Sequence, residues 1–316
     1  MKYVGLHTQQ ARNNFRSTVL LCLFPCLIVL LTLLFSVLFV RFTFGQPDWE
    51  QAMLMFWSAV PFVLAGVAIW FLIAYFANTA IIKAATGATA LQRKDNMRVY
   101  NLVENLCMAQ GMTMPKVNVI EDDSLNAYAS GINNNTYTVA LSRGIINKLD
   151  DAELEGVIAH ELAHIRNRDV RLLIVSIVFV GIFAMISQVA LRSLIYAPRR
   201  SGNNKGGAGI IVMILLALAV AALGYLIAIL LRFAISRKRE YLADAAAAEM
   251  TRQPQALASA LRKISRNPNI ASLTRDDVAQ LFIEHPKHKS GFSGAISGLF
   301  ATHPPIKKRI AVLEQF

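Results

Sequence analysis

Four long apolar stretches constrain the fold of this chain more than any other feature. They cover residues 19–40, 52–77, 172–191 and 209–231, and none contains Asp, Glu, Lys, Arg or His. A helix needs about 20 residues to cross the hydrocarbon core of a bilayer, and each stretch is long enough. The mean hydropathy of +0.44 is also high for a soluble domain. The sequence therefore predicts an integral membrane protein with four transmembrane helices.

The lack of ionisable residues in these stretches also bears on function. Transporters and proton pumps commonly place such residues at membrane depth, so a transport function is disfavoured. The first stretch follows Lys2, Arg12 and Arg16, as a secretory signal would. However, its apolar run is roughly twice the length of a signal core, and no small-residue cleavage site follows. We therefore expect a retained membrane anchor.

The distribution of lysine and arginine predicts the orientation of the spans. Cations precede the first span and follow the second, whereas the loop between them has Arg41 against Asp48 and Glu50. By the positive-inside rule, the N-terminus and the chain after residue 78 should face the cytoplasm. The loop of the later hairpin carries four cations and its flanks carry seven. This favours a crossing hairpin, with a shallow or protein-shielded hairpin as the alternative.

The net charge of +12 has a simple explanation in these flanking cations, which would lie against anionic lipid headgroups. The cations cluster beside the spans and not on a separate basic domain with interleaved aromatic residues, so nucleic acid is not an expected partner. Cys22 and Cys26 lie within the first stretch and Cys107 stands alone. The cysteines indicate neither a disulfide framework nor a thiolate zinc site, which suits a reducing cytoplasm.

The remaining sequence forms two blocks, which must belong to one domain if the hairpin returns the chain to the same side. The predicted organisation is an N-terminal segment with two spans over residues 1–78, a first block over 79–171, a hairpin over 172–231 and a second block over 232–316. The blocks read as mainly helical α+β. We expect strands over residues 116–120, 126–132 and 136–141, and helices over 96–110, 232–252 and 255–264, with a last helix after THPP. Asp150 with Glu153 predicts a capping box at the start of another helix.

That helix carries the sequence GVIAHELAHIRNRD, in which two histidines stand four positions apart. Positions four apart on a helix lie on one face, one turn apart, so His160 and His164 can reach one zinc ion at roughly 2.0–2.1 Å. Glu161 lies at the edge of that face, where it could take a proton from a zinc-activated water and pass it to a leaving amine. A buried helix that happens to carry imidazoles is the alternative, although chance produces this pattern on the order of once in a few hundred such chains.

A catalytic zinc needs a third protein ligand, and the second block offers one in SRKREYLADAAAAEM. Glu240 and Asp244 again stand one helical turn apart. We expect Glu240 to bind the metal and Asp244 to accept the N–H of a ligand histidine. No Gly or Pro interrupts the chain between Val157 and Leu172, so the arm of the hairpin should continue as one helix. A solvated carboxylate beside Arg239 is the alternative for Glu240.

Together these motifs resemble those of a known family. HELAH, EYLAD, NAYASG and the terminal THPPIKKRI are similar to the membrane-embedded zinc peptidases of the M48 family, in particular its bacterial heat-shock proteases, from about residue 97 to 313. The resemblance implies a cytoplasmic gluzincin-type α+β domain holding one zinc ion, with His160, His164 and Glu240 as ligands and Glu161 as general base. It also implies stress-related quality control at the bacterial inner membrane. The chain departs from the pattern in a longer segment before the first span.

The resemblance also implies substrate-binding positions. Asn126 and Ala127 match an edge strand that in similar peptidases pairs with the backbone of an extended substrate. His303 and Arg309 match positions near the cleft, where an imidazole or a cation could stabilise a tetrahedral oxyanion. A helix that starts at HPP and carries an exposed arginine explains these two residues equally well.

The sequence therefore predicts a zinc metalloendopeptidase that cleaves misfolded or damaged membrane proteins at the cytoplasmic face. Its expected partners are membrane protein or peptide substrates and the lipid bilayer. The alternative is a non-proteolytic membrane chaperone or scaffold with a structural zinc site. Loss of the general base or of a ligand would signal that alternative, and this chain retains all of them.

Overall fold

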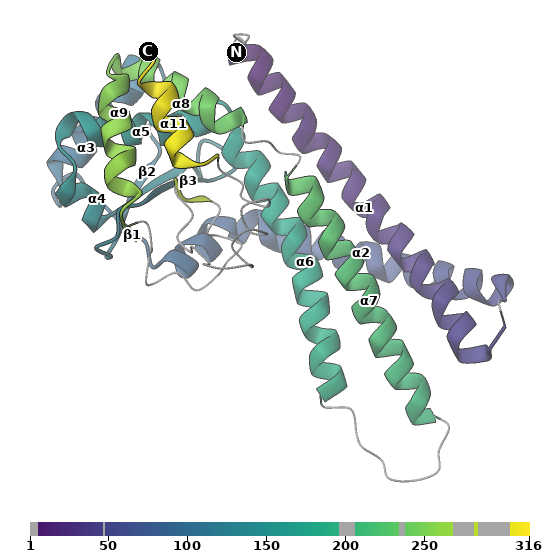
Figure 1. Ribbon diagram of the computed structural model, residues 1–316. Helices are drawn as coiled ribbons and strands as arrows, with labels where there is room; N and C mark the ends of the chain where they lie inside the picture. Colours follow the sequence, from purple (N-terminus) through teal and green to yellow (C-terminus); the bar gives the residue numbers. More distant parts are fainter. Residues whose placement is uncertain (1–5, 47, 196–205, 234–237, 268–280, 284–303) are drawn as a thin grey trace. The chain divides into compact units, whose positions relative to one another are not determined.

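The protein is mainly helical with one small mixed sheet (Figure 1). Its structure, a computed structural model, describes residues 6–46, 48–195, 206–233, 238–267, 281–283 and 304–316. The chain divides into two compact units. The first comprises Met1–Arg16, Ala77–Ile174 and Ile235–Phe316, and the second comprises Ser17–Phe76 and Val175–Ala234.

The sheet belongs to the first unit and has the order β1-β2-β4-β3. Its strands are β1 (Thr89–Ala90), β2 (Lys116–Ile120), β3 (Ala127–Ser130) and β4 (Thr138–Ser142). β2 and β4 are parallel, and the other two pairs are antiparallel. The sequence predicts β2, β3 and β4 to within two residues, whereas β1 has only two residues, both exposed, and was not predicted. β3 is thus an edge strand of the sheet.

Helix α5 (Asp151–Arg166) begins with the predicted capping box. The Asp150 side chain accepts a hydrogen bond from the Glu153 N–H at 2.9 Å, and the Glu153 side chain accepts one from the Asp150 N–H at 3.1 Å. The buried Glu153 carboxylate also accepts from Ser259 and Lys263 of α9 (Pro254–Ile264), at 2.7 and 2.6 Å. The start of α5 is therefore tied both to its own first turn and to α9.

Helix α5 does not continue into the next apolar stretch. It ends at Arg166, and α6 (Asp169–Ile195) begins after a break in which Arg168 has a φ of 61°. A left-handed conformation costs a non-glycine residue roughly 1–2 kcal/mol, so neighbouring contacts must hold it. The expectation of one continuous helical arm is wrong here, because tertiary contacts break a helix without any Gly or Pro.

Small side chains bring α5 and α8 (Lys238–Thr251) close together. Ala163 of α5 packs against Ala243 and Ala246 of α8, with Met250 beside them. The distance between packed helices depends on the side chains at their contact, so alanines permit a close approach. Figure 1 shows α8, α9 and α11 (Ile306–Leu313) grouped with α5. The alanine-rich run after EYLAD thus places the first turn of α8 against the HELAH helix.

The first unit also contains α3 (Met97–Ala109) and the short α4 (Arg143–Lys148). The Asn96 side chain caps α3 by accepting from the Val99 N–H at 3.0 Å. The predicted helix over residues 96–110 therefore forms with an N-cap of the ordinary type. α3 packs against α5 and supports it on a further side.

The second unit consists of parts of long helices. α1 (Leu6–Phe44) and α2 (Trp49–Thr86) contain the two segments of the described chain that are long and apolar enough to cross a membrane, Gln10–Phe44 and Trp49–Ile73. The third and fourth predicted spans lie on α6 and on α7 (Gly206–Phe233). Crossing by these two helices stays a prediction.

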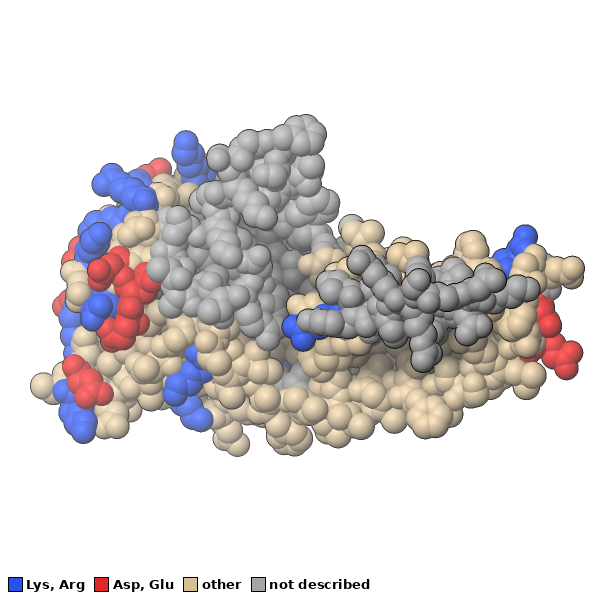
Figure 2. Space-filling view, turned by 90° about the horizontal axis from the view of Figure 1, so that it is seen from below, with Lys and Arg blue, Asp and Glu red and all other residues tan. Residues whose placement is uncertain are grey.

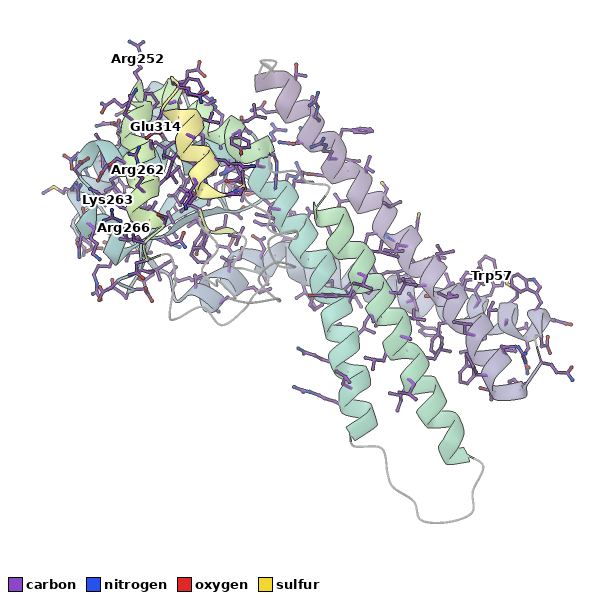
Figure 3. The ribbon with its side chains drawn as sticks, in the orientation of Figure 1. Trp57, Arg252, Arg262, Lys263, Arg266 and Glu314 are labelled. Carbon is purple, nitrogen blue, oxygen red and sulfur yellow. The ribbon has the colours of Figure 1, made fainter. Side chains whose placement is uncertain are left out.

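The second unit has its own apolar core. Phe24 and Phe183 lie edge to face with ring centroids 5.6 Å apart, and Ile28 and Ile182 are buried beside them. Many other large apolar side chains remain exposed, and Figure 3 shows one of them, Trp57, which is 63% exposed. In Figure 2 the charged side chains gather over the first unit, and the drawn surface of the second unit is mostly uncharged. Exposed apolar area on this scale is typical of a surface that another apolar phase covers.

Candidate metal centre

Three potential metal ligands converge from two helices of the first unit. His160 and His164 come from α5 and Glu240 from the first turn of α8, and one ligand atom of each lies within 4.8 Å of the others. The two Nε2 atoms are 3.2 Å apart, and each is 3.7 Å from an oxygen of Glu240. Two nitrogens bound tetrahedrally at about 2.0–2.1 Å would lie about 3.3–3.4 Å apart. The cluster therefore fits a single zinc-sized ion.

A carboxylate holds the other ring nitrogen of each histidine. Asp244 Oδ1 lies 3.0 Å from His160 Nδ1, and Asp169 Oδ2 lies 3.1 Å from His164 Nδ1. A carboxylate on Nδ1 fixes the tautomer and directs Nε2 toward a metal. The sequence predicts this role for Asp244 but not for Asp169. The signal in the sequence is an acidic residue three positions after the HELAH helix ends at Arg166.

Arg309 completes the His160 side of the centre. Its guanidinium donates to Asp244 Oδ2 from Nε at 2.9 Å and to Asp244 Oδ1 from Nη2 at 2.7 Å. It also lies 3.5 Å from Glu240 Oε2, and the side chain is fully buried. The structure thus places Arg309 next to Asp244, and it is not among the residues that line the adjoining cavity. His303, the other predicted oxyanion-binding residue, lies outside the described residues.

Buried charges shift the protonation of this cluster. Burial raises the pKa of Asp244, but the Arg309 guanidinium and the hydrogen bond to His160 outweigh it and lower that pKa to about 2. Burial and Arg309 lower the pKa of His160, but the carboxylates of Asp244 and Glu240 outweigh them and raise it to about 9. At neutral pH this pKa favours the imidazolium form of His160, with a proton on both ring nitrogens, and a divalent cation at Nε2 would have to displace the proton there.

Glu161 faces a small cavity beside the cluster. The cavity has a volume of about 30 Å³, and its lining includes Glu161, His164, Glu240, Ala129 and Leu281. This is enough room for a water molecule. Burial raises the pKa of the Glu161 carboxyl above its usual range, against lowering contributions from the two histidines. A carboxylate with a raised pKa next to a water site suits a group that takes up and returns a proton.

The chain itself occupies part of the β3 edge. The Asn126 carbonyl accepts from the Ser142 N–H and so faces β4, whereas the Ala127 carbonyl accepts from the Ile283 N–H at 2.9 Å. The Ala127 N–H donates to the Asn126 side chain at 3.0 Å. Both polar backbone groups of Ala127 are thus bonded within the chain. Tyr128 and Phe282 form an antiparallel bridge, so the segment Leu281–Ile283 runs along the outer edge of β3 from Ala127 to Ala129.

The comparisons with known proteins identify the family of this chain. The profile of Peptidase family M48 matches residues 93–316, so the chain belongs to this peptidase family. It is similar to the Protease HtpX homolog of Bacteroides fragilis, with 64% identity over the full length of both chains. It is also similar to the Protease HtpX homolog of Lactobacillus helveticus, with 37% identity over 98% of this chain and 99% of that protein.

The resemblance inferred from HELAH, EYLAD, NAYASG and THPPIKKRI is therefore confirmed. Among solved structures, that of S. mikatae Ste24p aligns with 89% of this chain and 61% of its own, with a TM-score of 0.44 and 19% identity. This last similarity is too low to add to the argument. Membership of the M48 peptidase family implies a divalent metal ion, and the His-His-Glu cluster is the candidate place for it.

Proposed function

We propose that this chain is an integral membrane zinc endopeptidase in which Glu161 is the general base. The observation that carries the proposal is the convergence of two imidazole Nε2 atoms and the Glu240 carboxylate beside a cavity that Glu161 lines. Two nitrogens and one carboxylate are a frequent protein ligand set of catalytic zinc, with one position left open. Zinc bound there would supply Lewis acidity, which polarises a scissile carbonyl and makes a water molecule acidic near neutral pH.

The surrounding residues would have distinct roles. Glu161 would take a proton from the attacking water and deliver it to the leaving nitrogen. Asp244 and Asp169 would hold His160 and His164 with their Nε2 atoms turned inward. Arg309 would act through Asp244, which it contacts in bidentate fashion, and the predicted oxyanion role stays with His303.

Substrate recognition through the main chain would suit a protease with varied substrates. An extended peptide that adds to a sheet edge gains hydrogen bonds independent of its side chains. Because the segment Leu281–Ile283 pairs with β3 at this edge, we infer that a substrate peptide would take its place beside Ala127 and Ala129, next to the cavity that Glu161 lines. Asn126 would then shape the edge by holding the Ala127 N–H. This mode of binding fits misfolded or damaged membrane proteins, which offer extended segments of many sequences.

The proposed location is the bacterial cytoplasmic membrane, with the peptidase domain on the cytoplasmic side. Two candidate spans, the apolar lengths of α6 and α7 and the exposed apolar side chains of the second unit support insertion in a membrane. The distribution of cations around the first two stretches supports the orientation. Relatives from Bacteroides fragilis and Lactobacillus helveticus support a bacterial enzyme.

The decisive variant is Glu161→Gln. It should bind zinc as the unmodified protein does but lose cleavage of a membrane-anchored test substrate by a factor of about 10² to 10⁴, the usual contribution of a general base. Glu155→Gln is a matched control on the same helix, and it should retain activity because Glu155 does not line the cavity. Undiminished turnover by Glu161→Gln would refute the mechanism.

Metal removal separates an enzyme from a scaffold with a structural zinc. Dialysis against a chelator should abolish cleavage while circular dichroism and thermal unfolding in detergent show that most of the fold remains. A structural zinc would instead take much of the folding free energy with it. Collapse of the first unit on chelation would therefore favour the scaffold.

A further inference from the structure

The start of α1 contacts the break between α5 and α6. Gln10 Nε2 donates to the Arg166 carbonyl at 2.7 Å, one helical turn before Asn13. Asn13 Nδ2 donates to the Asn167 carbonyl at 2.9 Å and to Asp169 Oδ1 at 2.7 Å. Asn13 is only 3% exposed. A polar side chain from more than 150 positions earlier in the chain is thus buried against the end of the HELAH helix.

Asn13 bridges a strained point of the backbone. Its amide contacts the residues on both sides of Arg168, which has a φ of 61°. Such a conformation persists only where surrounding contacts determine it. Arg239 of α8 donates to the Asp169 carbonyl at 3.2 Å and lies 3.9 Å from Asp169 Oδ1. Asn13 of α1 makes the shorter contact with that oxygen, a hydrogen bond of 2.7 Å.

The two oxygens of that carboxylate have different partners. Asp169 Oδ1 accepts from Asn13, and Asp169 Oδ2 lies against His164 Nδ1 at 3.1 Å. We propose that Asn13 is a positioning residue of the metal centre, which fixes the Asp169 carboxylate so that it orients His164. The inference rests on the proposed metal site, and it gives a role to the segment before the first apolar stretch.

The experiment measures metal binding by Asn13→Ala in the full-length protein in detergent. A buried hydrogen bond contributes about 0.5–1.5 kcal/mol, so zinc affinity in chelator competition should fall about 2- to 10-fold. The absorption spectrum of the Co²⁺-loaded protein should shift as the geometry at His164 relaxes. Gln10→Ala is the matched control, because it removes an equivalent contact to Arg166 that does not touch Asp169. It should retain both zinc affinity and the Co²⁺ spectrum.

A double-mutant cycle tests whether the effect passes through Asp169. In an Asp169→Ala background, Asn13→Ala should cause no further loss of zinc affinity. Equal losses from Asn13→Ala in both backgrounds, or equal losses from Asn13→Ala and Gln10→Ala, would overturn the proposal. So would wild-type affinity in Asn13→Ala. Because the readout is zinc binding, these outcomes are independent of whether Glu161→Gln abolishes cleavage, so the positioning role and the peptidase function can fail separately.

Discussion

Each histidine of the metal centre has a carboxylate on its Nδ1, but the two carboxylates differ in their own partners. The His160 side chain is almost fully buried, and the Asp244 carboxylate on its Nδ1 is itself bound by the Arg309 guanidinium. The His164 side chain is 14% exposed, and the Asp169 carboxylate on its Nδ1 is bound by the neutral amide of Asn13, with the Arg239 guanidinium farther away at 3.9 Å. Both carboxylates are buried, but the guanidinium lies 2.7 Å from Asp244 and 3.9 Å from Asp169, and the attraction between two charges weakens with distance. Substitutions on the His160 side should therefore lower the stability of the protein more than substitutions on the His164 side.

The largest effect should come from Arg309→Met. This change leaves the Asp244 carboxylate buried without its guanidinium partner, and breaking such a pair typically costs about 3–5 kcal/mol. Thermal or denaturant unfolding in detergent measures the loss. Lys308→Met is the matched control, since Lys308 is exposed on the same helix and should change stability by less than about 0.5 kcal/mol. Equal effects of the two variants would contradict the charged character of the His160 side.

Asp169→Asn should have an intermediate effect that falls on metal binding. Loss of the carboxylate next to a ligand histidine typically lowers metal affinity about 10- to 100-fold. Stability should change little, because Asn keeps the shape of the side chain and the guanidinium nearest to Asp169, that of Arg239, lies 3.9 Å away. Asp244→Asn, measured in the same chelator competition and unfolding assays, should lose stability as well. If Asp169→Asn unfolds the protein as readily as Asp244→Asn does, the two sides do not differ.

The sequence predicts those parts of the site that depend on position along one helix. A spacing of four identifies His160 with His164, and the same spacing pairs Glu240 with Asp244, because a helix fixes which residues share a face. Asp169 could not be predicted in this way. It contacts His164 across a break between two helices, where Arg168 has a left-handed conformation and other segments contact the backbone.

In the fold, too, local features were predictable from the sequence and long-range contacts were not. Apolar length predicted helices over all four stretches, since hydrophobic runs and helix formation are local properties. The N-cap of α3 and the capping box of α5 follow equally from local sequence. Other contacts join residues that are far apart in sequence and depend on tertiary packing. Examples are those of Arg309 with Asp244 and of Ile283 with Ala127. No periodicity in the sequence specifies those contacts.

A smaller effect is expected where a buried carboxylate has a partly exposed partner. The buried Glu153 lies 2.6 Å from Lys263, whose side chain is 41% exposed. Figure 3 shows Lys263 and Arg262 on α9, and Arg266 just after the helix ends. Lys263→Met should lower the free energy of unfolding by at most about 1 kcal/mol, because water screens the pair. A loss as large as that of Arg309→Met would show that exposure of the cation does not set the strength of these pairs.

The smallest effect is expected at Cys107, where a single cause acts. Burial alone raises the pKa of its thiol to about 11. In contrast to His160, no neighbouring charge contributes to this shift. At pH 8 the reactive thiolate should be on the order of a hundredfold scarcer than in an ordinary thiol, so alkylation by iodoacetamide should be slow in the folded protein and accelerate toward pH 11. Replacement of Cys22 and Cys26 by alanine isolates the signal. Rapid alkylation at pH 8, under conditions that keep the fold, would mean that this interior solvates charge readily, and the charged partners of His160 would then be less necessary than the structure implies.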